Sequence, residues 1–133
     1  MSLLLDTHVW IWSQESPRKL GPIAVRQLKD PRQELYVSTV STLELARLLA
    51  AGIIELSGTL HSWVNETLGA MECRTIEISH EVAIGAYLLQ APFHKDPADR
   101  ILVATARIHG LTLVTADARM LSYPHLQTQD ARK

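Results

Sequence analysis

The alternation of short β-rich runs with longer helical stretches constrains the fold of this chain most strongly. Aliphatic and β-branched residues mark the expected strands at Leu3–Asp6, Leu35–Ser38, Arg74–Ile78 and Thr112–Thr115, with a short edge strand at Leu126–Thr128. Apolar periodicity marks the expected helices at Val9–Gln14, Pro22–Lys29, Thr42–Ala51, Leu60–Met71, Glu81–Gln90 and Ala98–His109. Strands separated by helices of this length pair in parallel through right-handed crossovers. The pattern predicts an α/β fold with a mostly parallel central sheet of four to five strands and helices on both faces.

Length and composition are those of a globular protein. The 133 residues are 47% hydrophobic and 20% charged, which predicts one compact domain over residues 1–133. The single cysteine, Cys73, is expected to be an inert thiol in a reducing compartment. No basic leader precedes the first apolar run, and no apolar stretch approaches the roughly 20 residues that a membrane helix needs. We therefore expect a cytoplasmic protein that does not enter a membrane.

The charge balance limits how this protein could bind nucleic acid. Thirteen basic residues against fourteen acidic ones give a net charge of −1. A protein that grips nucleic acid through a broad basic face neutralises many phosphates and carries excess positive charge. Any action on nucleic acid is therefore expected at a local site, with metal ions supplying positive charge.

Four carboxylates stand where a parallel sheet would gather them. Asp6 ends the first expected strand, and Glu44 lies in the first turn of the helix after the second strand. Asp99 lies in the first turn of the helix before the strand Thr112–Thr115, and Asp117 lies just past that strand. Ligands of open α/β sheets bind beyond the carboxyl ends of the strands. All four side chains are expected to face one crevice there.

Each of these acids also has a purely structural explanation. Asp6 and Asp117 are each placed to cap the helical segment that follows. Ser41 and Glu44 match a capping box, in which Ser41 begins the helix and Glu44 reaches back to its amide. Asp99 would be favourable against the dipole of its helix. Taken singly, each acid is explained by helix capping or, for Asp99, by the helix dipole.

The combination of the four acids favours a cation site. Two like charges about 4 Å apart repel by about 4 kcal/mol at an effective dielectric constant of 20. A helix cap returns only about 1 kcal/mol, so a crevice holding several carboxylates needs a compensating cation. Mg²⁺ takes one or two carboxylates and keeps waters, which leaves positions open for phosphate oxygens. Without metal, neutralising one acid, such as Asp117, is expected to leave stability unchanged or to raise it.

Other chemistries lack their motifs. The sequence contains no P-loop and no GxGxxG after a strand, and its six histidines form no HExxH motif. No serine stands in a GxSxG setting. A response-regulator receiver would need an acidic pair after the first strand, where only Asp6 stands. It would also need a lysine after a late strand, where this sequence has Thr115 and Ala116.

Four segments together resemble those of PIN-domain proteins, and in particular the VapC-type toxins of bacterial toxin–antitoxin pairs. The segments are Leu5–Trp10 (LDTHVW), Ser38–Glu44 (STVSTLE), His94–Arg100 (HKDPADR) and Leu113–Asp117 (LVTAD). The resemblance implies an endoribonuclease dependent on Mg²⁺ or Mn²⁺, and it assigns the catalytic and metal-binding acids to Asp6, Glu44, Asp99 and Asp117. It also implies that the Thr115 hydroxyl supports the last acid. Asp96 either joins the outer shell of the metal or only caps its helix, with Pro97 at the first helical position.

Further side chains near these motifs have two interpretations each. Lys95 and Arg100 would flank the crevice and contact phosphates, or they are solvated surface. His8 is a base or, more simply, a hydrogen-bonded structural histidine, and Trp10 and Trp12 are expected to pack in the core or an interface. From the resemblance we expect an RNA substrate, a homodimer and a cognate antitoxin that inserts a basic side chain into the acidic site.

Three functions remain open from the sequence. The first is an RNA-cleaving toxin, and the second is a related metal-dependent nuclease that acts on DNA or on structured RNA. The third is a PIN-like binding scaffold without turnover, which the presence of all four acids disfavours.

Overall fold

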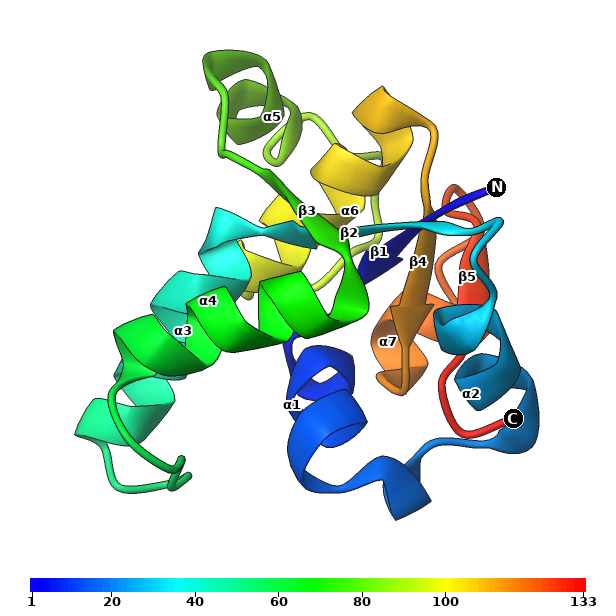
Figure 1. Ribbon diagram of the computed structural model, residues 1–133. Helices are drawn as coiled ribbons and strands as arrows, with labels where there is room; N and C mark the ends of the chain where they lie inside the picture. Colours follow the sequence, from blue (N-terminus) through cyan, green and yellow to red (C-terminus); the bar gives the residue numbers. More distant parts are fainter.

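A computed structural model describes all 133 residues and contains a five-stranded sheet that is parallel throughout (Figure 1). Its strands are β1 (Ser2–Leu5), β2 (Glu34–Ser38), β3 (Cys73–Ile76), β4 (Thr112–Thr115) and β5 (Thr128–Asp130). The helices are α1 (Thr7–Glu15), α2 (Pro22–Lys29), α3 (Thr39–Ala50), α4 (Leu60–Met71), α5 (His80–Gly85), α6 (Pro97–His109) and α7 (Ala118–Leu121), with a 3₁₀ turn at Pro17–Lys19. The predicted α/β fold class is confirmed.

In the strand order β3-β2-β1-β4-β5, the side of β1 on which new strands are added changes once along the chain. From β1 the chain builds β2 and β3 on one side, and it then returns to place β4 and β5 on the other side. This switch point lies between β1 and β4, which is where open α/β sheets form their binding crevice. Leu5 of β1 pairs with Val114 of β4, so Asp6 and Thr115 follow side by side at the carboxyl edge.

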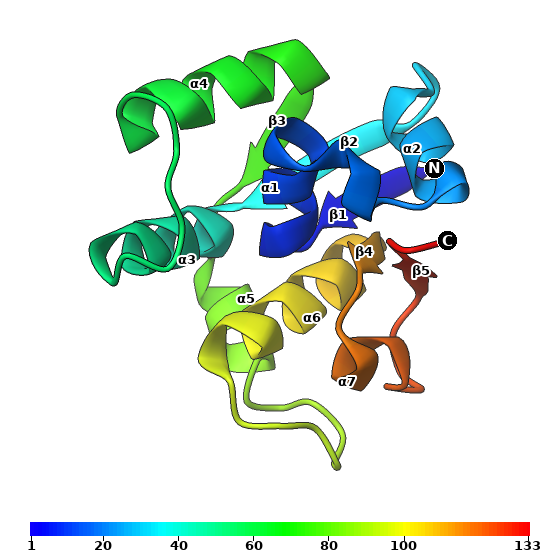
Figure 2. The same ribbon diagram turned by 90° about the horizontal axis from the view of Figure 1, so that it is seen from below.

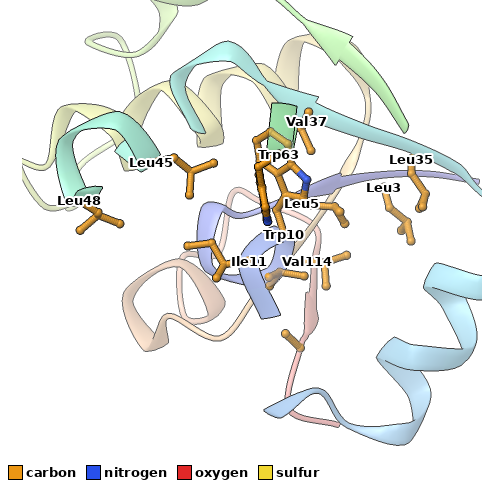
Figure 3. Close-up of a cluster of buried hydrophobic side chains, with 12 residues drawn as sticks. Leu3, Leu5, Trp10, Ile11, Leu35, Val37, Leu45, Leu48, Trp63 and Val114 are labelled. Atoms are coloured by element: carbon orange, nitrogen blue, oxygen red, sulfur yellow. The ribbon is translucent and has the colours of Figure 1, made fainter. Parts of the chain in front are cut away.

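Helices cover both faces of the sheet, with α1, α2 and α4 on one face and α5, α6 and α7 on the other (Figure 2). Successive side chains of a strand point to opposite faces. Leu3 and Leu5 therefore pack with Trp10 and Trp63 in one hydrophobic cluster, the first core. Leu4 packs with Leu102 and Leu113 in another cluster, the second core. In the first core the rings of Trp10 and Trp63 lie 5.1 Å apart beside Leu5 (Figure 3).

Helix α3 begins three residues earlier than expected. Ser38, rather than Ser41, is its N-cap, and the Ser38 hydroxyl accepts the Val40 N–H at 3.1 Å. Ser38, Thr39 and Ser41 are all capable caps, and the earlier start buries Val40 in the second core. The predicted capping box is therefore wrong, and Glu44 lies in the second turn of the helix.

Other element boundaries also differ from the expectation. Asp6 is the N-cap of α1, which starts at Thr7, rather than the last residue of β1. Helix α5 ends at Gly85, well before Gln90, and the chain continues in turns. The edge strand β5 is shifted by two residues because Thr128 pairs with Leu113, whereas Leu126 packs against the second core.

Two further observations bear on the expectations about membranes and about Cys73. None of the helices has the length and apolarity required to span a bilayer. The Cys73 thiol is partly buried, and burial raises its pKa to about 12, so the thiol stays protonated near neutral pH.

Gly21, just before α2, lets the backbone pass close to the last residues of the chain. Its N–H donates to the Ala131 carbonyl at 2.9 Å, and an added Cβ would overlap the backbone of Arg132 and Lys133. Gly21→Ala should therefore lower the free energy of unfolding by about 1–3 kcal/mol in urea titrations. The matched change Gly69→Ala, inside α4 with open space around the new methyl group, should raise it by about 0.5–1 kcal/mol. Equal effects of the two changes would contradict this contact.

Candidate active site

The four predicted acids line one cleft of about 380 Å³. It opens at the carboxyl edge of β1 and β4, the edge around which Figure 2 shows α1, α3, α6 and α7. The lining residues are Asp6, His8, Trp12, Glu44, Arg47, Asp96, Asp99, Ala116, Asp117, Arg119 and Arg132. Side chains separated by more than a hundred positions in the sequence thus share one site.

Two short hydrogen bonds hold the carboxyl group of Asp6. Its Oδ1 accepts the Thr7 N–H at 2.7 Å, and its Oδ2 accepts the Thr115 hydroxyl at 2.7 Å. The Asp6 residue is only 7% exposed, and burial raises the pKa of the carboxyl, an effect that the Thr115 hydrogen bond opposes. Asp6 therefore caps α1 and also lines the cleft.

Thr115 connects the first and last acids. Its hydroxyl donates to Asp6 and accepts the Asp117 N–H at 3.0 Å. The resemblance implied support for the last acid only. In the structure the hydroxyl proton goes to the first acid, and the hydroxyl oxygen holds the backbone of the last acid.

Glu44 reaches the site through a contact between α1 and α3. The Thr7 hydroxyl lies 2.8 Å from Glu44 Oε1 and 2.9 Å from the Ser41 hydroxyl. An ionised carboxylate only accepts, so the single Thr7 proton goes to Glu44 and Ser41 donates to Thr7. Sequence reasoning missed this role of Thr7, and it misplaced Ser41 as a cap.

The negative charge of every other acid in the cleft acts on the pKa of Asp99. Asp99 stands in the first turn of α6, where its N–H donates to Asp96 Oδ1 at 3.2 Å, so Asp96 is a helix cap. Burial, and after it the negative charges of the neighbouring carboxylates, together raise the pKa of Asp99 to about 7. Those neighbours are Asp6, Asp96, Asp117 and Glu44. This concentration of negative charge is the electrostatic cost predicted from the sequence.

Asp117 differs from Asp99 because it already forms a close ion pair with Arg119. Its Oδ1 accepts the N–H of Arg119, and the guanidinium of Arg119 grips both carboxylate oxygens at 3.2 and 2.9 Å. These bonds hold the pKa of Asp117 below its ordinary value. Arg119 Nη2 also lies 3.6 Å from Asp99 Oδ2. Sequence reasoning missed Arg119, whose only signal is its position two residues after a capping aspartate.

The basic residues around the cleft are not those expected. Arg47 and Arg132 line it, and Arg132 donates to the Ala116 carbonyl at 2.6 Å. Arg100 instead donates to the Ala86 carbonyl at 3.2 Å and does not line the cleft. Of the two interpretations left open by the sequence, the structure therefore does not support Arg100 flanking the crevice, and Lys95 is solvated surface outside the cleft lining.

The aromatic residues of α1 separate into two roles. Trp10 is fully buried, as expected, and its indole N–H donates to Thr67 at 3.0 Å. Trp12 lines the cleft, with the exposed ring of His8 edge-on to it at 6.3 Å between ring centroids. His8 makes no side-chain hydrogen bond, so the hydrogen-bonded structural role expected for it is wrong.

The donor set of this cleft fits a hard divalent cation. Carboxylate oxygens are the ligands that Mg²⁺ and Mn²⁺ prefer. No group of three or more His, Cys, Asp or Glu side chains has the spacing of a complete ligand set. Mg²⁺ needs only one or two protein carboxylates beside its waters, so the arrangement suffices. The raised pKa of Asp99 marks where positive charge is most needed.

The raised pKa of Asp99 and the lowered pKa of Asp117 predict opposite effects of Asp99→Asn and Asp117→Asn on stability. In the folded chain Asp99 binds its proton more tightly than in the unfolded chain, where its pKa is about 3.9. In chelator the free energy of unfolding should therefore fall by about 1–3 kcal/mol as the pH rises from about 4 to about 7. Asp99→Asn should remove this fall and be the more stable protein at pH 8.

Asp117→Asn is the matched control for that experiment, because it removes a carboxylate that Arg119 already neutralises. Its free energy of unfolding at pH 8 should be unchanged or lower by up to about 1 kcal/mol. This corrects the expectation from the sequence, which chose Asp117 as the acid whose neutralisation relieves repulsion. Thermal melts from pH 4 to pH 8 check both variants, and a stabilised Asp117→Asn protein would refute the assignment.

Comparison with known proteins agrees with this fold. The family model for the PIN domain matches residues 3–126. The chain is 39% identical over 124 residues, 93% of each sequence, to Ribonuclease VapC22 of Mycobacterium tuberculosis. Its fold is similar to that of a chain in the solved structure of VapBC2 from Rickettsia felis bound to a promoter DNA fragment, with a TM-score of 0.72 and 16% identity over 97% of this chain and 98% of that one. It is also similar to a chain in the structure of VapBC-1 from Haemophilus influenzae, with a TM-score of 0.65 and 19% identity over 100% of both chains. By family model and by sequence identity, the chain belongs to the PIN-domain family.

Proposed function

We propose that this protein is a metal-dependent endoribonuclease and the toxin of a toxin–antitoxin pair. The observation that carries the proposal is the meeting of Asp6, Glu44, Asp99 and Asp117 in one cleft at the switch point of the sheet. The 39% identical relative, which is named a ribonuclease, supports the assignment of RNA as the substrate.

Asp6, Glu44, Asp99 and Asp117 are the residues that would hold Mg²⁺ or Mn²⁺. A bound cation would activate a water molecule and stabilise the charge that develops on the attacked phosphate and the leaving oxygen. Thr115 and the Thr7 amide fix the orientation of Asp6, and the Thr7 hydroxyl fixes Glu44. These groups hold the acids in place before substrate arrives, so little reorganisation is required.

Three arginines around the acids suit a substrate with a phosphate backbone. Arg47 comes from α3, Arg119 from α7, and Arg132 from the segment after β5. Arginine binds phosphate oxygens in a fork geometry. This local ring of cations reconciles a phosphodiester substrate with a net charge of −1.

The partner proposed for this protein is an antitoxin. The solved structures with a similar fold include a toxin–antitoxin complex from Klebsiella pneumoniae and VapBC assemblies from other bacteria. A basic side chain of such a partner would find several carboxylates in the cleft. A homodimer is proposed on the family resemblance alone.

Substitution of the acids tests the proposed chemistry. Asp6→Asn, Glu44→Gln, Asp99→Asn and Asp117→Asn should each lower the rate of RNA cleavage by about a hundredfold or more, because each removes charge that holds or positions the metal. Asp96→Asn should be milder because asparagine still caps α6. Glu81→Gln, at an exposed position of α5 outside the cleft, is a matched carboxylate-to-amide control that should cleave like the wild type. Initial rates on a labelled RNA measure all six proteins.

The same assay separates the competing functions. Chelator should abolish cleavage, and Mg²⁺ or Mn²⁺ should restore it. Preference for DNA or for structured RNA would move the assignment to the second nuclease class, and binding without cleavage would favour the scaffold. Full activity in chelator, or near wild-type turnover by Asp99→Asn, would overturn the proposed mechanism.

A further inference from the structure

His94 belongs to the segment HKDPADR, yet nothing in the proposed chemistry uses it. Its side chain is 17% exposed, and its Nε2 lies 3.2 Å from Asp99 Oδ2. The other ring nitrogen, Nδ1, accepts the Asp96 N–H at 3.4 Å. A neutral imidazole whose Nδ1 accepts carries its proton on Nε2. The ring therefore presents an N–H to the acid at the start of α6.

This N–H is not satisfied in the structure. His94 Nε2 is buried, and no hydrogen bond reaches it, because its contact with Asp99 Oδ2 is short but poorly aligned. A buried donor without a partner is rare and calls for an explanation. Hydrogen bonds at catalytic groups are often misaligned before ligands bind, and they tighten in the loaded site. A modest rotation of the Asp99 carboxyl would align this one.

The surroundings hold the imidazole in place. The Phe93 ring lies 4.4 Å from the His94 ring and 4.8 Å from the Tyr123 ring. The Tyr123 hydroxyl donates to the Gln90 carbonyl at 2.7 Å, and the Arg100 guanidinium lies 5.8 Å from the centre of the Phe93 ring. Arg100 thus helps to fix the segment before α6. These contacts restrict the imidazole, so the alignment is expected to come from the Asp99 carboxyl.

We propose that His94 is a positioning residue for Asp99, donating from Nε2 to Asp99 Oδ2 when that acid takes a divalent cation. The inference rests on the proposed function, since it gives Asp99 a metal to hold. Arg119 Nη2 lies farther from the same oxygen, at 3.6 Å, on a side chain that is 58% exposed and already committed to Asp117. The buried histidine is therefore the better-fixed donor. Loss of such supporting partners typically weakens metal affinity 10–100-fold.

Three substitutions of His94 test this role by calorimetric titration with Mn²⁺, which needs no turnover. The side-chain amide of His94→Gln can replace the Nε2 donor, whereas His94→Asn reaches only as far as Nδ1, and His94→Leu fills the space without a donor. The Mn²⁺ dissociation constant should rise tenfold or more in His94→Asn and His94→Leu. It should stay within about threefold of the wild type in His94→Gln.

Melting temperatures in chelator distinguish positioning from general structure. If all three variants bind Mn²⁺ like the wild type, or if all three lose affinity and melting temperature together, the proposal is overturned. Recovery of affinity in His94→Gln alone supports it, even if His94→Leu does not fold.

A double-mutant cycle separates failure of this inference from failure of the proposed function. If the wild type binds no Mn²⁺, the proposed metal chemistry fails. The contact is still tested in chelator by His94→Leu, Asp99→Asn and the double variant. Non-additive shifts in melting temperature would show that the 3.2 Å contact already couples the two side chains without metal, and additive shifts together with unchanged Mn²⁺ affinity in the His94 variants would overturn the proposal.

Discussion

The hydrogen bond from the Thr115 hydroxyl to the buried carboxylate of Asp6 joins the ends of the two central strands, and the site depends on it. The parallel pairing of β1 with β4 places the two residues side by side at the switch point of the strand order. Thr115 also holds the Asp117 amide, so one hydroxyl fixes the first acid and the backbone of the last. On the other side, the N–H of Thr7 holds Asp6 while its hydroxyl holds Glu44.

Helix capping and site chemistry use the same residues in this molecule. Asp6, Asp96 and Asp117 each cap a helix, and all three line the cleft. A cap must stand at the start of a helix. Helices α1 and α7, which follow parallel strands, and helix α6, which leads into β4, all start at the carboxyl edge of the sheet. The geometry that makes these aspartates good caps therefore also gathers them. The resulting repulsion falls most heavily on Asp99, because Arg119 already neutralises Asp117.

The fold class and the gathering of the four acids could be predicted because both follow from the order of strands and helices. Membership of the PIN-domain family, expected from four short segments, is confirmed. The start of α3 could not be predicted, since three residues within one short segment, Ser38, Thr39 and Ser41, can cap it, and tertiary burial of Val40 decides between them. The roles of Arg119 and Arg100 depend on which way a long side chain turns, which no local pattern encodes. The cytoplasmic location and the homodimer stay predictions.

The central claim is that the cleft between β1 and β4 binds a divalent cation through its carboxylates. Anomalous scattering from crystals soaked in Mn²⁺ tests it most directly, since Mn²⁺ is visible at its own absorption edge. The account predicts a peak inside the cleft, within bonding distance of a carboxylate of Asp6 or Asp99, with the guanidinium of Arg119 moved away from Asp99. Absence of any peak in the cleft at saturating Mn²⁺, with Arg119 still on both acids, would contradict it.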